Sequence, residues 1–373
     1  MNLEQLFCPN IDCPARGQAN QGNLVIHSQI EKRCLCSVCN KSFAITKGTL
    51  FYRLRTDPKV VMCVIVLLAY GCPTQAIVQA FGFDERTVKN WWERAGHQCE
   101  AVHEHLIGQS QLDLQQVQAD EIKAKILGGS LWLAMAIMVS TRLWLGGVAS
   151  PHRDLELIQS LADRIRAMAL CRPLLLAVDG LPGYPKAFQR AFRSKVPRSG
   201  KKGRPQLYAW PDIAIVQVIK RRLPAGLEIE RRIVQGGPLL VKRLRQMTQN
   251  EPGVINTAYI ERLNATFRMR LSWLTRRTRT LAQQPETLTA GLFIVGCFYN
   301  LCDPHHSLRL RLSVGRFGHR WVNRTPAMAA ALTDHIWTVD ELLKYRVPTA
   351  RWKPPKQRGR RSKELLQVIE RWC

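Results

Sequence analysis

The chain has 373 residues, 46% of them hydrophobic, which gives room for roughly two or three globular domains with separate cores. Its 55 Lys and Arg residues against 28 Asp and Glu give a formal net charge of +27, which indicates a polyanionic partner. The longest apolar run, residues 60–70, has eleven residues. A helix that spans a bilayer needs about 20, so we expect no membrane partner.

Cysteine usage indicates a reducing compartment. The twelve cysteines are divided between an N-terminal cluster and scattered single residues, whereas secreted disulfide scaffolds are usually short chains. The first residues show no basic-then-apolar signal pattern, so we expect an intracellular, cytoplasmic protein. Most of the single cysteines lie among apolar neighbours and are interpreted as reduced core residues, namely Cys63, Cys72, Cys171, Cys297 and Cys302.

Residues 1–50 have the cysteine spacing of a zinc ribbon. Cys8 and Cys13 enclose four residues, and Cys36 and Cys39 enclose two, with residues 22–30 as the expected hairpin between the pairs. Zn²⁺ binds four thiolates well, and a segment with few large apolar residues needs a metal to hold its turns. We interpret Cys8, Cys13, Cys36 and Cys39 as ligands of a structural zinc ion. Cys34 is an alternative to Cys36, and free thiols are the alternative to zinc.

Residues 56–108 predict a helix-turn-helix domain. Asp57-Pro58 is a helix start, a second helix runs from Pro73-Thr74 to near Gly82, and a third begins at Asp84 and extends toward Leu106. In this motif the last helix enters the major groove of DNA. Four of its polar residues are candidate DNA contacts, namely Arg86, Lys89, Asn90 and Arg94. A plain three-helix packing unit is the alternative. We expect that Trp91 and Trp92 do not both face the core.

From residue 112 the pattern changes to strands. Residues 117–122, 131–139 and 143–148 predict an antiparallel meander, and a helix from about Arg153 leads to an apolar strand over residues 174–178. Such a crossover makes the last strand parallel to its neighbour. The sequence therefore predicts a multidomain chain of α+β and α/β type, with a mixed-sheet domain over residues 112–310.

The remaining segments are strongly basic. Residues 186–250 are interpreted as a basic insertion, with a mobile loop carrying most of the charge and two strands near residues 212–220 and 227–234. An apolar helix over residues 285–300 is expected to close the core, followed by a helical extension over residues 311–350. Residues 351–373 are interpreted as a basic tail without structure of its own. The loop cations are Arg190, Arg193, Lys195, Arg198, Lys201, Lys202 and Arg204.

Three carboxylates occur where these elements can bring them together. Asp120 lies in the first strand, Asp179 follows the apolar strand, and Glu261 lies near the start of a helix with Leu263, Phe267, Leu271 and Leu274 on its apolar face. Like charges at close range are stable together when a cation lies between them, and Mg²⁺ prefers carboxylate oxygens. Two such ions about 4 Å apart activate the attacking oxygen and stabilise the leaving oxygen at a phosphodiester.

The blocks around these carboxylates resemble those of a DDE-type insertion-sequence transposase with an N-terminal zinc ribbon. The matching segments are Ala119-Asp120-Glu121, Ala177-Val178-Asp179-Gly180 with Tyr184, and Ile260-Glu261-Arg262-Leu263-Asn264 with Arg268 and Arg276-Arg277-Thr278. The resemblance extends over nearly the whole chain up to Tyr345. It implies an RNase H-like catalytic domain, with Asp120, Asp179 and Glu261 holding two Mg²⁺ ions, for which Mn²⁺ can substitute. Asn264 and Arg268 are then expected to hold the metal-bound phosphate or the Glu261 carboxylate, and Arg276 and Arg277 are expected to contact phosphate.

The resemblance also implies partners. We expect double-stranded DNA, both element ends and target DNA, a homo-oligomer, a nucleoid-associated location, and no small-molecule substrate. Two other functions stay open: a catalytically inert DNA-binding regulator derived from a transposase, and a structure-selective nuclease. Glu121 is the alternative to Asp120, because successive strand residues face opposite ways and only one of the two can enter the site.

Overall fold

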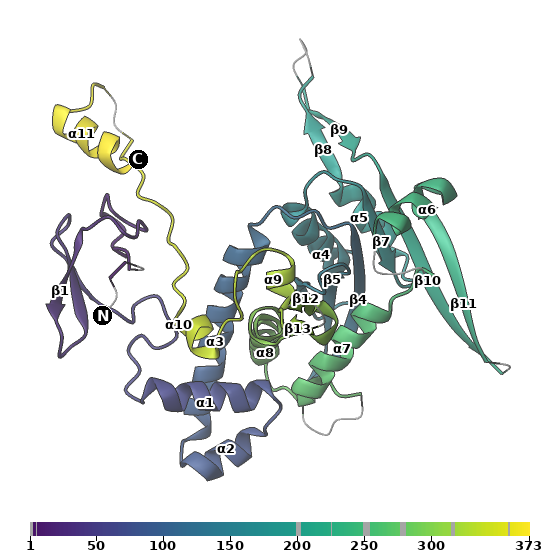
Figure 1. Cartoon of the computed structure of the whole chain (residues 1–373), viewed down its shortest axis with the longest axis horizontal. Coiled ribbons are helices and arrows are strands. Elements are labelled where there is room, and N and C mark those ends of the chain that lie inside the picture. Colours follow the sequence, from purple (N-terminus) through teal and green to yellow (C-terminus); the bar gives the residue numbers. More distant parts are fainter. Residues whose placement is uncertain are drawn as a thin grey trace. The chain divides into compact units, whose positions relative to one another are not determined.

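The computed structural model describes residues 3–4, 6–198, 203–224, 226–248, 254–276, 281–314, 318–356 and 359–373 (Figure 1). The chain divides into two compact units. Unit 1 comprises Met1–Met62 and Asp340–Cys373, and unit 2 comprises Cys63–Val339. The second and third predicted helices therefore belong to the same unit as the large sheet, and the C-terminal residues belong with the cysteine-rich N-terminus.

Unit 1 is built on a three-stranded antiparallel sheet. Strands β1 (Leu24–Ser28), β2 (Arg33–Cys36) and β3 (Ser42–Ala44) pair in the order β1-β2-β3. A hairpin is present as expected, but it extends over residues 24–36 and not 22–30, because the second strand includes Cys34 and Cys36. The sheet is small, and four buried cysteines contribute to its core. The stability of such a small segment depends on a bound metal or another cross-link more than on the burial of apolar side chains.

The interpretation of residues 351–373 as an unstructured tail is wrong for their last part. Helix α11 (Lys363–Trp372) begins at Ser362, whose side chain accepts a hydrogen bond from the amide of Leu365. Trp372 is buried in the cysteine-rich core of unit 1, and its carbonyl accepts a 2.8 Å hydrogen bond from the Gln18 side chain. Burial of this large aromatic side chain stabilises the packing of α11 on the cysteine-rich core. The composition of residues 351–373 does not reveal this interaction.

The three predicted helices are present. They are α1 (Pro58–Ala69), α2 (Thr74–Phe81) and α3 (Glu85–His103), which continues in a π-helical turn, Glu104–Gly108. Helix α2 ends at Gly82, which has a φ of +68° that favours glycine, and the Asp84 side chain caps α3. No described helix is long and apolar enough to cross a membrane.

The expectation that Trp91 and Trp92 do not both face the core is wrong, because both are buried. Adjacent helical residues point about 100° apart, and α3 is covered on two sides. The ring of Trp91 meets Phe83 at 4.9 Å, whereas the Trp92 indole donates a 2.9 Å hydrogen bond to the carbonyl of Thr287 in α8 (Pro285–Cys297). Trp92 thus joins the third predicted helix to the helix expected to close the core.

Unit 2 contains a six-stranded mixed sheet. Its strands are β4 (Gln116–Ile126), β5 (Gly129–Met138), β6 (Trp144–Ser150), β7 (Leu174–Val178), β10 (Ile213–Leu223) and β11 (Gly226–Gln235), in the order β11-β10-β7-β4-β5-β6. Strands β4, β5 and β6 form the predicted antiparallel meander. Helix α4 (Leu155–Met168) then crosses over to β7, which is parallel to β4 as predicted.

Helices bury the centre of this sheet. Helix α4 packs on β5 and β6 and on α5 (Gly183–Ala191), and α7 (Ala258–Arg270) packs on β4 and β5. Helix α8 packs on β6 and α3 and continues in a π-helical turn, Phe298–Cys302. The five residues of β7 are all buried, which explains their uninterrupted apolar sequence. Asp179 follows the last residue of β7, beside Asp120 in the middle of β4.

The interpretation of residues 186–250 as an insertion is corrected by the sheet. Strand β10 pairs in parallel with β7 and is a core strand, because its first half is apolar and buried. Part of the predicted mobile loop forms a hairpin of β8 (Arg193–Val196) and β9 (Gln206–Ala209), while Lys201 and Lys202 lie outside the described residues. Helix α6 (Gly237–Met247) packs on β7, β10 and β11.

The segment 311–350 is less helical than predicted. It begins within a hairpin of β12 (Leu310–Val314) and β13 (Gly318–Val322), followed by the short helices α9 (Pro326–Ala329) and α10 (Val339–Lys344). The alternation of apolar and basic residues in Leu310-Arg311-Leu312 has the period of a strand, a signal that the basic composition obscured.

Candidate active site

Asp120 and Asp179 lie next to each other because their strands are neighbours. Strand β4 pairs in parallel with β7, and Ala119 is opposite Val178 in the register. The next residue on each strand is therefore an aspartate. Ligand oxygens of Asp120, Glu121 and Asp179 all lie within 4.8 Å of one another. This is the spacing expected of side chains that share one cation.

Glu261 reaches the same cavity from helix α7. A cavity of about 460 Å³ is lined by Asp120, Asp179 and Glu261, together with Arg153, Lys220 and Thr257. Glu261 accepts a hydrogen bond from Thr257 and forms an ion pair with Lys220 of β10. Glu261 is not part of the close group of carboxylates, and both Lys220 and Thr257 contact its Oε1 atom.

The electrostatics of the three predicted carboxylates differ. Burial, with the charges of Glu121, Asp179 and Glu261, raises the pKa of Asp120 to about 7, although the amide of Glu121 opposes this. Burial and the Glu121 charge also raise the pKa of Asp179. Burial acts to raise the pKa of Glu261, but the contacts from Lys220 and Thr257 outweigh it and lower that pKa. A divalent cation between Asp120 and Asp179 would relieve their repulsion, so the donor set fits Mg²⁺ or Mn²⁺.

Glu121 is buried beneath the cavity. Its side chain is 0% exposed, its Oε1 accepts a 2.9 Å hydrogen bond from Nε of Arg153, and its Oε2 has no hydrogen-bond partner. Arg153 also reaches Asp179, at 3.4 Å, and its guanidinium lies 5.0 Å from the centre of the Trp132 ring. Asp120 lines the cavity and Glu121 does not. Glu121 instead holds the guanidinium group of Arg153 beside Asp179.

Asn264 connects helix α7 to strand β4. It is buried in α7, and its Nδ2 donates a 2.8 Å hydrogen bond to Oδ2 of Asp120. Two residues before Asp120, the side chain of Gln118 accepts hydrogen bonds of 3.0 Å from the amides of Tyr259 and Ile260. These amides belong to the first turn of α7, whose donors have no partner inside the helix. Gln118 and Asn264 therefore fix α7, and with it Glu261, against β4.

Sequence reasoning missed Gln118, Arg153 and Lys220. Gln118 carried a usable signal, because it is a polar residue two positions before Asp120 and faces the same side of the strand. Lys220 and Arg153 carried no such signal in the sequence. The position of Lys220 depends on the pairing of β10 with β7, and that of Arg153 depends on the path of the chain into α4.

Of the three arginines predicted to bind phosphate, the structure describes Arg268 and Arg276. Arg268 of α7 is half-buried and its Nε has no hydrogen-bond partner. Burial and the nearby charge of Arg276 lower the pKa of Arg268, and the charge of Asp120 opposes this. Arg276 is exposed, and Arg277 lies outside the described residues. Arg268 does not line the carboxylate cavity, although its charge interacts with that of Asp120.

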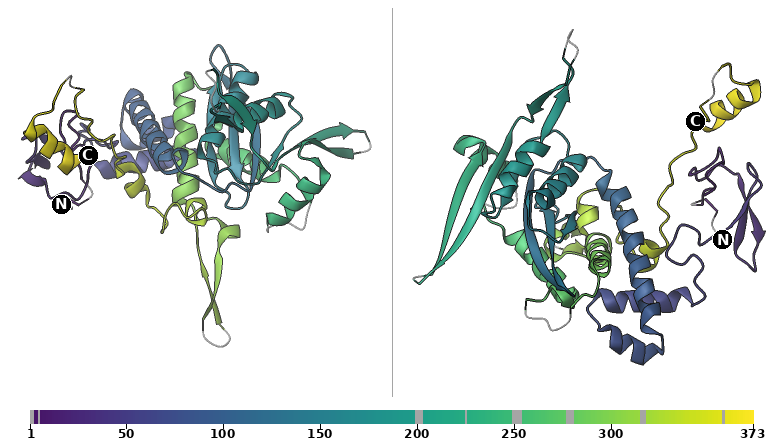
Figure 2. Two further views of the ribbon diagram at one scale, coloured as in Figure 1. Left: turned by 90° about the horizontal axis from the view of Figure 1, so that it is seen from above. Right: turned by 180° about the vertical axis from the view of Figure 1, so that it is seen from behind.

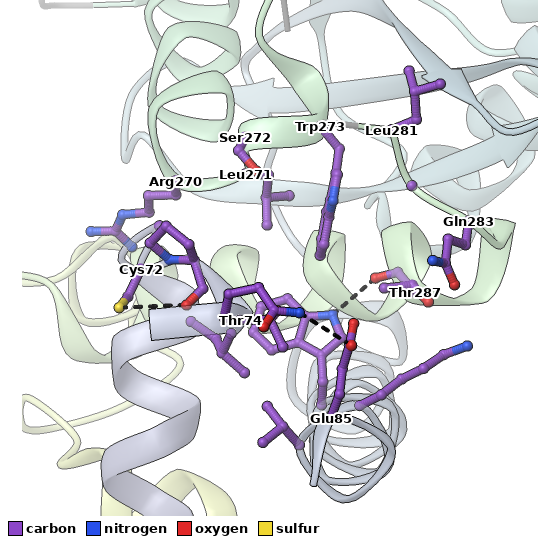
Figure 3. Close-up of a pocket in the computed structure, with 18 residues that line it drawn as sticks. Cys72, Thr74, Glu85, Arg270, Leu271, Ser272, Trp273, Leu281, Gln283 and Thr287 are labelled. Atoms are coloured by element: carbon purple, nitrogen blue, oxygen red, sulfur yellow. Dashed lines mark hydrogen bonds between the residues drawn. The ribbon is translucent and has the colours of Figure 1, made fainter. Parts of the chain in front are cut away.

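The candidate DNA contacts on α3 are not equivalent. Arg86 and Asn90 are exposed, whereas Arg94 is half-buried. Lys89 donates a 2.7 Å hydrogen bond to Gln284, at the start of α8, and lies 3.8 Å from Glu93. Figure 3 shows the start of α3, with Glu85, facing Trp273 and Thr287 across a cavity of about 410 Å³. Lys89 is therefore partly committed to contacts within unit 2.

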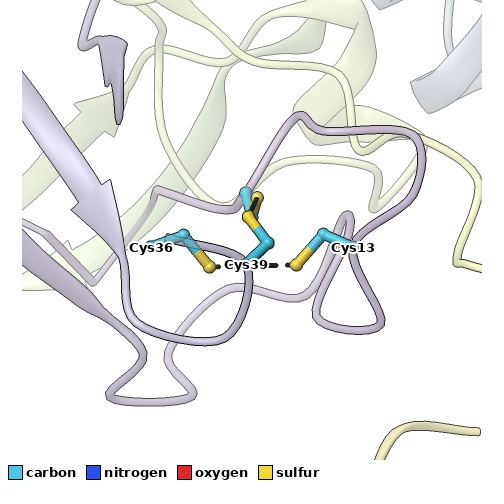
Figure 4. Close-up of side chains that lie close together, drawn as sticks. Cys13, Cys36 and Cys39 are labelled. Atoms are coloured by element: carbon cyan, nitrogen blue, oxygen red, sulfur yellow. Dashed lines mark hydrogen bonds between the residues drawn. The ribbon is translucent and has the colours of Figure 1, made fainter. Parts of the chain in front are cut away.

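The four cysteines selected from the sequence lie together in unit 1. The sulfur atoms of Cys8, Cys13, Cys36 and Cys39 are all within 4.8 Å of one another, with Cys13 and Cys36 3.8 Å apart (Figure 4). Cys34 is buried but outside this group, which favours Cys36. Burial raises the pKa of Cys8 to about 12, so a cation is needed to hold thiolates here. The cluster can hold zinc, and Asn23 donates a 3.3 Å hydrogen bond to the Cys36 sulfur.

No protein-family model matches the sequence, and no curated protein matches it significantly. The relevant features are Asp120 within β4 and Asp179 just after the adjacent parallel strand β7, the helix that carries Glu261, and the four-cysteine cluster.

Proposed function

We propose that this chain is a DNA transposase with an RNase H-like catalytic domain, whose Asp120, Asp179 and Glu261 bind divalent metal. The observation that carries the proposal is the entry of these three carboxylates into one cavity, two from adjacent parallel strands and one from α7. The sheet supports it, because a meander followed by a helical crossover and two parallel strands is the strand order of that domain.

Two bound Mg²⁺ ions would supply activation of the attacking oxygen and stabilisation of the leaving oxygen at a phosphodiester. Asp120 and Asp179 would hold the ions, and Glu261 would complete the set after release from Lys220. Asn264 keeps the Asp120 carboxylate in one orientation through its 2.8 Å hydrogen bond. Arg268, a half-buried cation whose charge interacts with that of Asp120, is proposed to contact a phosphate oxygen of DNA.

Two cations of the chain itself stabilise the carboxylates when no metal is bound. Lys220 pairs with Glu261, and Arg153 bridges Glu121 and Asp179. Both side chains are about one-third exposed, at 33% and 37%, so they remain accessible to substrate. We infer that a phosphate of DNA would bind Lys220 and Arg153 when their carboxylate partners hold metal. DNA and metal would then enter the site together.

The cysteine cluster and helices α1–α3 supply a route to recognition of element ends. A zinc-held ribbon presents a fixed surface, and Arg86 and Asn90 are exposed at the start of α3, where such helices meet base edges. We propose duplex DNA, as element ends and as target, for the polyanionic partner implied by the charge of +27. We also propose a homo-oligomer in the nucleoid, because joining two ends at one target requires paired sites.

The proposal is tested with a plasmid that carries the gene and its flanking DNA, incubated with purified protein and Mg²⁺. Cleavage confined to the element's ends is expected, and Glu261→Gln should abolish it. Glu228→Gln, at an exposed position of β11, is the matched control and should cleave normally. End binding without cleavage by the wild type would favour the inert regulator. Cleavage without preference for the ends would favour the structure-selective nuclease.

A further inference from the structure

The hairpin of β12 and β13 projects from unit 2 without support from neighbouring elements. It is the yellow-green ribbon that extends away from the sheet in the left view of Figure 2. Neither strand packs extensively on another described helix or strand. Its large apolar side chains, Leu310, Leu312, Val314 and Trp321, are between 43% and 55% exposed. An isolated two-stranded hairpin is marginally stable in water, so this one is suited to a partner that covers it.

The hairpin has two different faces. Arg311 is opposite Trp321 in the register and Ser313 is opposite His319, so these side chains share one face. Leu310, Leu312 and Val314 lie on the other face, together with Arg320, which is opposite Leu312. The Arg309 guanidinium lies 4.9 Å from the centre of the Trp321 ring, and Arg311 reaches His319 at 3.4 Å. We call Arg309, Arg311, His319 and Trp321 the basic-aromatic face.

The charge of this segment identifies the class of partner. From Pro304 to Thr333 the sequence contains five arginines and three histidines but no Asp or Glu. The longer hairpin of β10 and β11 differs, because Glu230 pairs with both Arg221 and Arg232 there. On the basic-aromatic face no described carboxylate neutralises the guanidinium groups, so the matching surface is a polyanion.

We propose that the basic-aromatic face binds duplex DNA, with its arginines on phosphates and the exposed Trp321 against sugar or base edges. The major groove of DNA admits a two-stranded ribbon, and arginine with aromatic residues is a combination suited to it. The proposal rests on the proposed function for the choice of DNA as polyanion, but it requires no catalysis. A second copy of the chain fits this face poorly, because two faces of like charge repel.

The test compares substitutions on the two faces of one strand. Arg311→Thr and Leu312→Thr both place a good strand former at neighbouring positions of β12, one on each face. Binding of the full chain to duplex DNA of arbitrary sequence is measured by anisotropy at several salt concentrations. Arg311→Thr should weaken binding about tenfold and lower the salt slope by about 1. Leu312→Thr should bind as the wild type does, and Trp321→Leu should weaken binding with the salt slope unchanged.

Arg311→Lys serves as the charge control and should keep the salt slope, which excludes misfolding as the cause of the loss in Arg311→Thr. Equal affinity and equal salt slope for wild type and Arg311→Thr would overturn the inference and leave the proposed function standing. If Leu312→Thr dissociates an oligomer and also weakens DNA binding, the inference is overturned. The face that carries Leu310, Leu312 and Val314 would then bind a second copy of the chain. Wild type that does not bind DNA would overturn both proposals.

Discussion

Asn264 on α7 and Asp120 on β4 are joined by a 2.8 Å hydrogen bond across 144 positions of the chain. The bond is made by a buried side chain in the helix that also carries Glu261. It therefore ties the orientation of one proposed metal ligand to the position of another. Outer partners of this kind commonly affect metal affinity or activity about 10- to 100-fold.

Asn264→Ala should lower the rate of Mg²⁺-dependent cleavage about 10- to 100-fold, because Asp120 loses the donor that fixes its carboxylate. Single-turnover cleavage across a range of Mg²⁺ concentrations is the measurement. Met269→Ala, at a position 72% exposed on the same helix, is the control and should leave the rate unchanged. Equal rates for wild type and Asn264→Ala at all Mg²⁺ concentrations would show that this bond does not position Asp120.

Arg153→Leu should destabilise the protein by roughly 1–3 kcal/mol, because it leaves the fully buried Glu121 carboxylate without its donor. The double variant Glu121→Leu/Arg153→Leu should recover much of this loss, because no buried charge is then left unpaired. Denaturant unfolding of the wild type, the two single variants and the double variant gives the coupling energy. Additive effects of the two substitutions would contradict the pairing.

The stability of the protein without Mg²⁺ should fall as pH rises from about 4 to about 7. The pKa of Asp120 is raised from 3.8 to about 7 in the folded protein, so the folded state holds this proton more tightly than the unfolded chain does. The advantage of the protonated form is present below this window and is lost across it. Asp120→Asn should therefore raise the melting temperature more at pH 8 than at pH 5. Added Mg²⁺ should flatten the pH dependence of the wild type, and an equal effect of Asp120→Asn at both pH values would contradict the assignment.

Cys36→Ser should lose zinc, and Cys34→Ser should retain about one zinc ion per chain, because only Cys36 lies within the four-sulfur group. Elemental analysis of the purified variants measures this directly. Both residues are buried in the same core, so the pair is matched for packing. Retention of zinc by Cys36→Ser together with loss by Cys34→Ser would reverse the ligand assignment.

The spacing of apolar residues, together with the residues that begin and end helices and strands, predicted the elements that carry the carboxylates. The apolar run before Asp179 has the signature of a strand buried on both faces, and the three-strand meander alternates as expected. The start of α7 near Glu261 and the cysteine pairs were also readable, because they depend on residues close together in the sequence. Spacing alone favoured Cys36 over Cys34, and the sulfur positions agree with it.

Interactions between distant residues were not predictable in this way. A strand was predicted near residues 212–220, but its place in the core sheet was not, since that place depends on the pairing of β10 with β7. Trp372 gave no local sign of packing on a ribbon more than 300 positions earlier, where it meets Gln18. Arg153 and Lys220 likewise became site residues only when the crossover and the sheet brought them to the carboxylates.

The most direct test of the account is strand transfer by the full chain on DNA carrying the element's own end, with Mg²⁺. Joined products are expected with the wild type and should be absent with Glu261→Gln and with Asp179→Asn, while both variants still bind the end. Joined products that persist in either variant would contradict the assignment of the metal-binding carboxylates. End binding by the wild type without any metal-dependent product would contradict the transposase function itself.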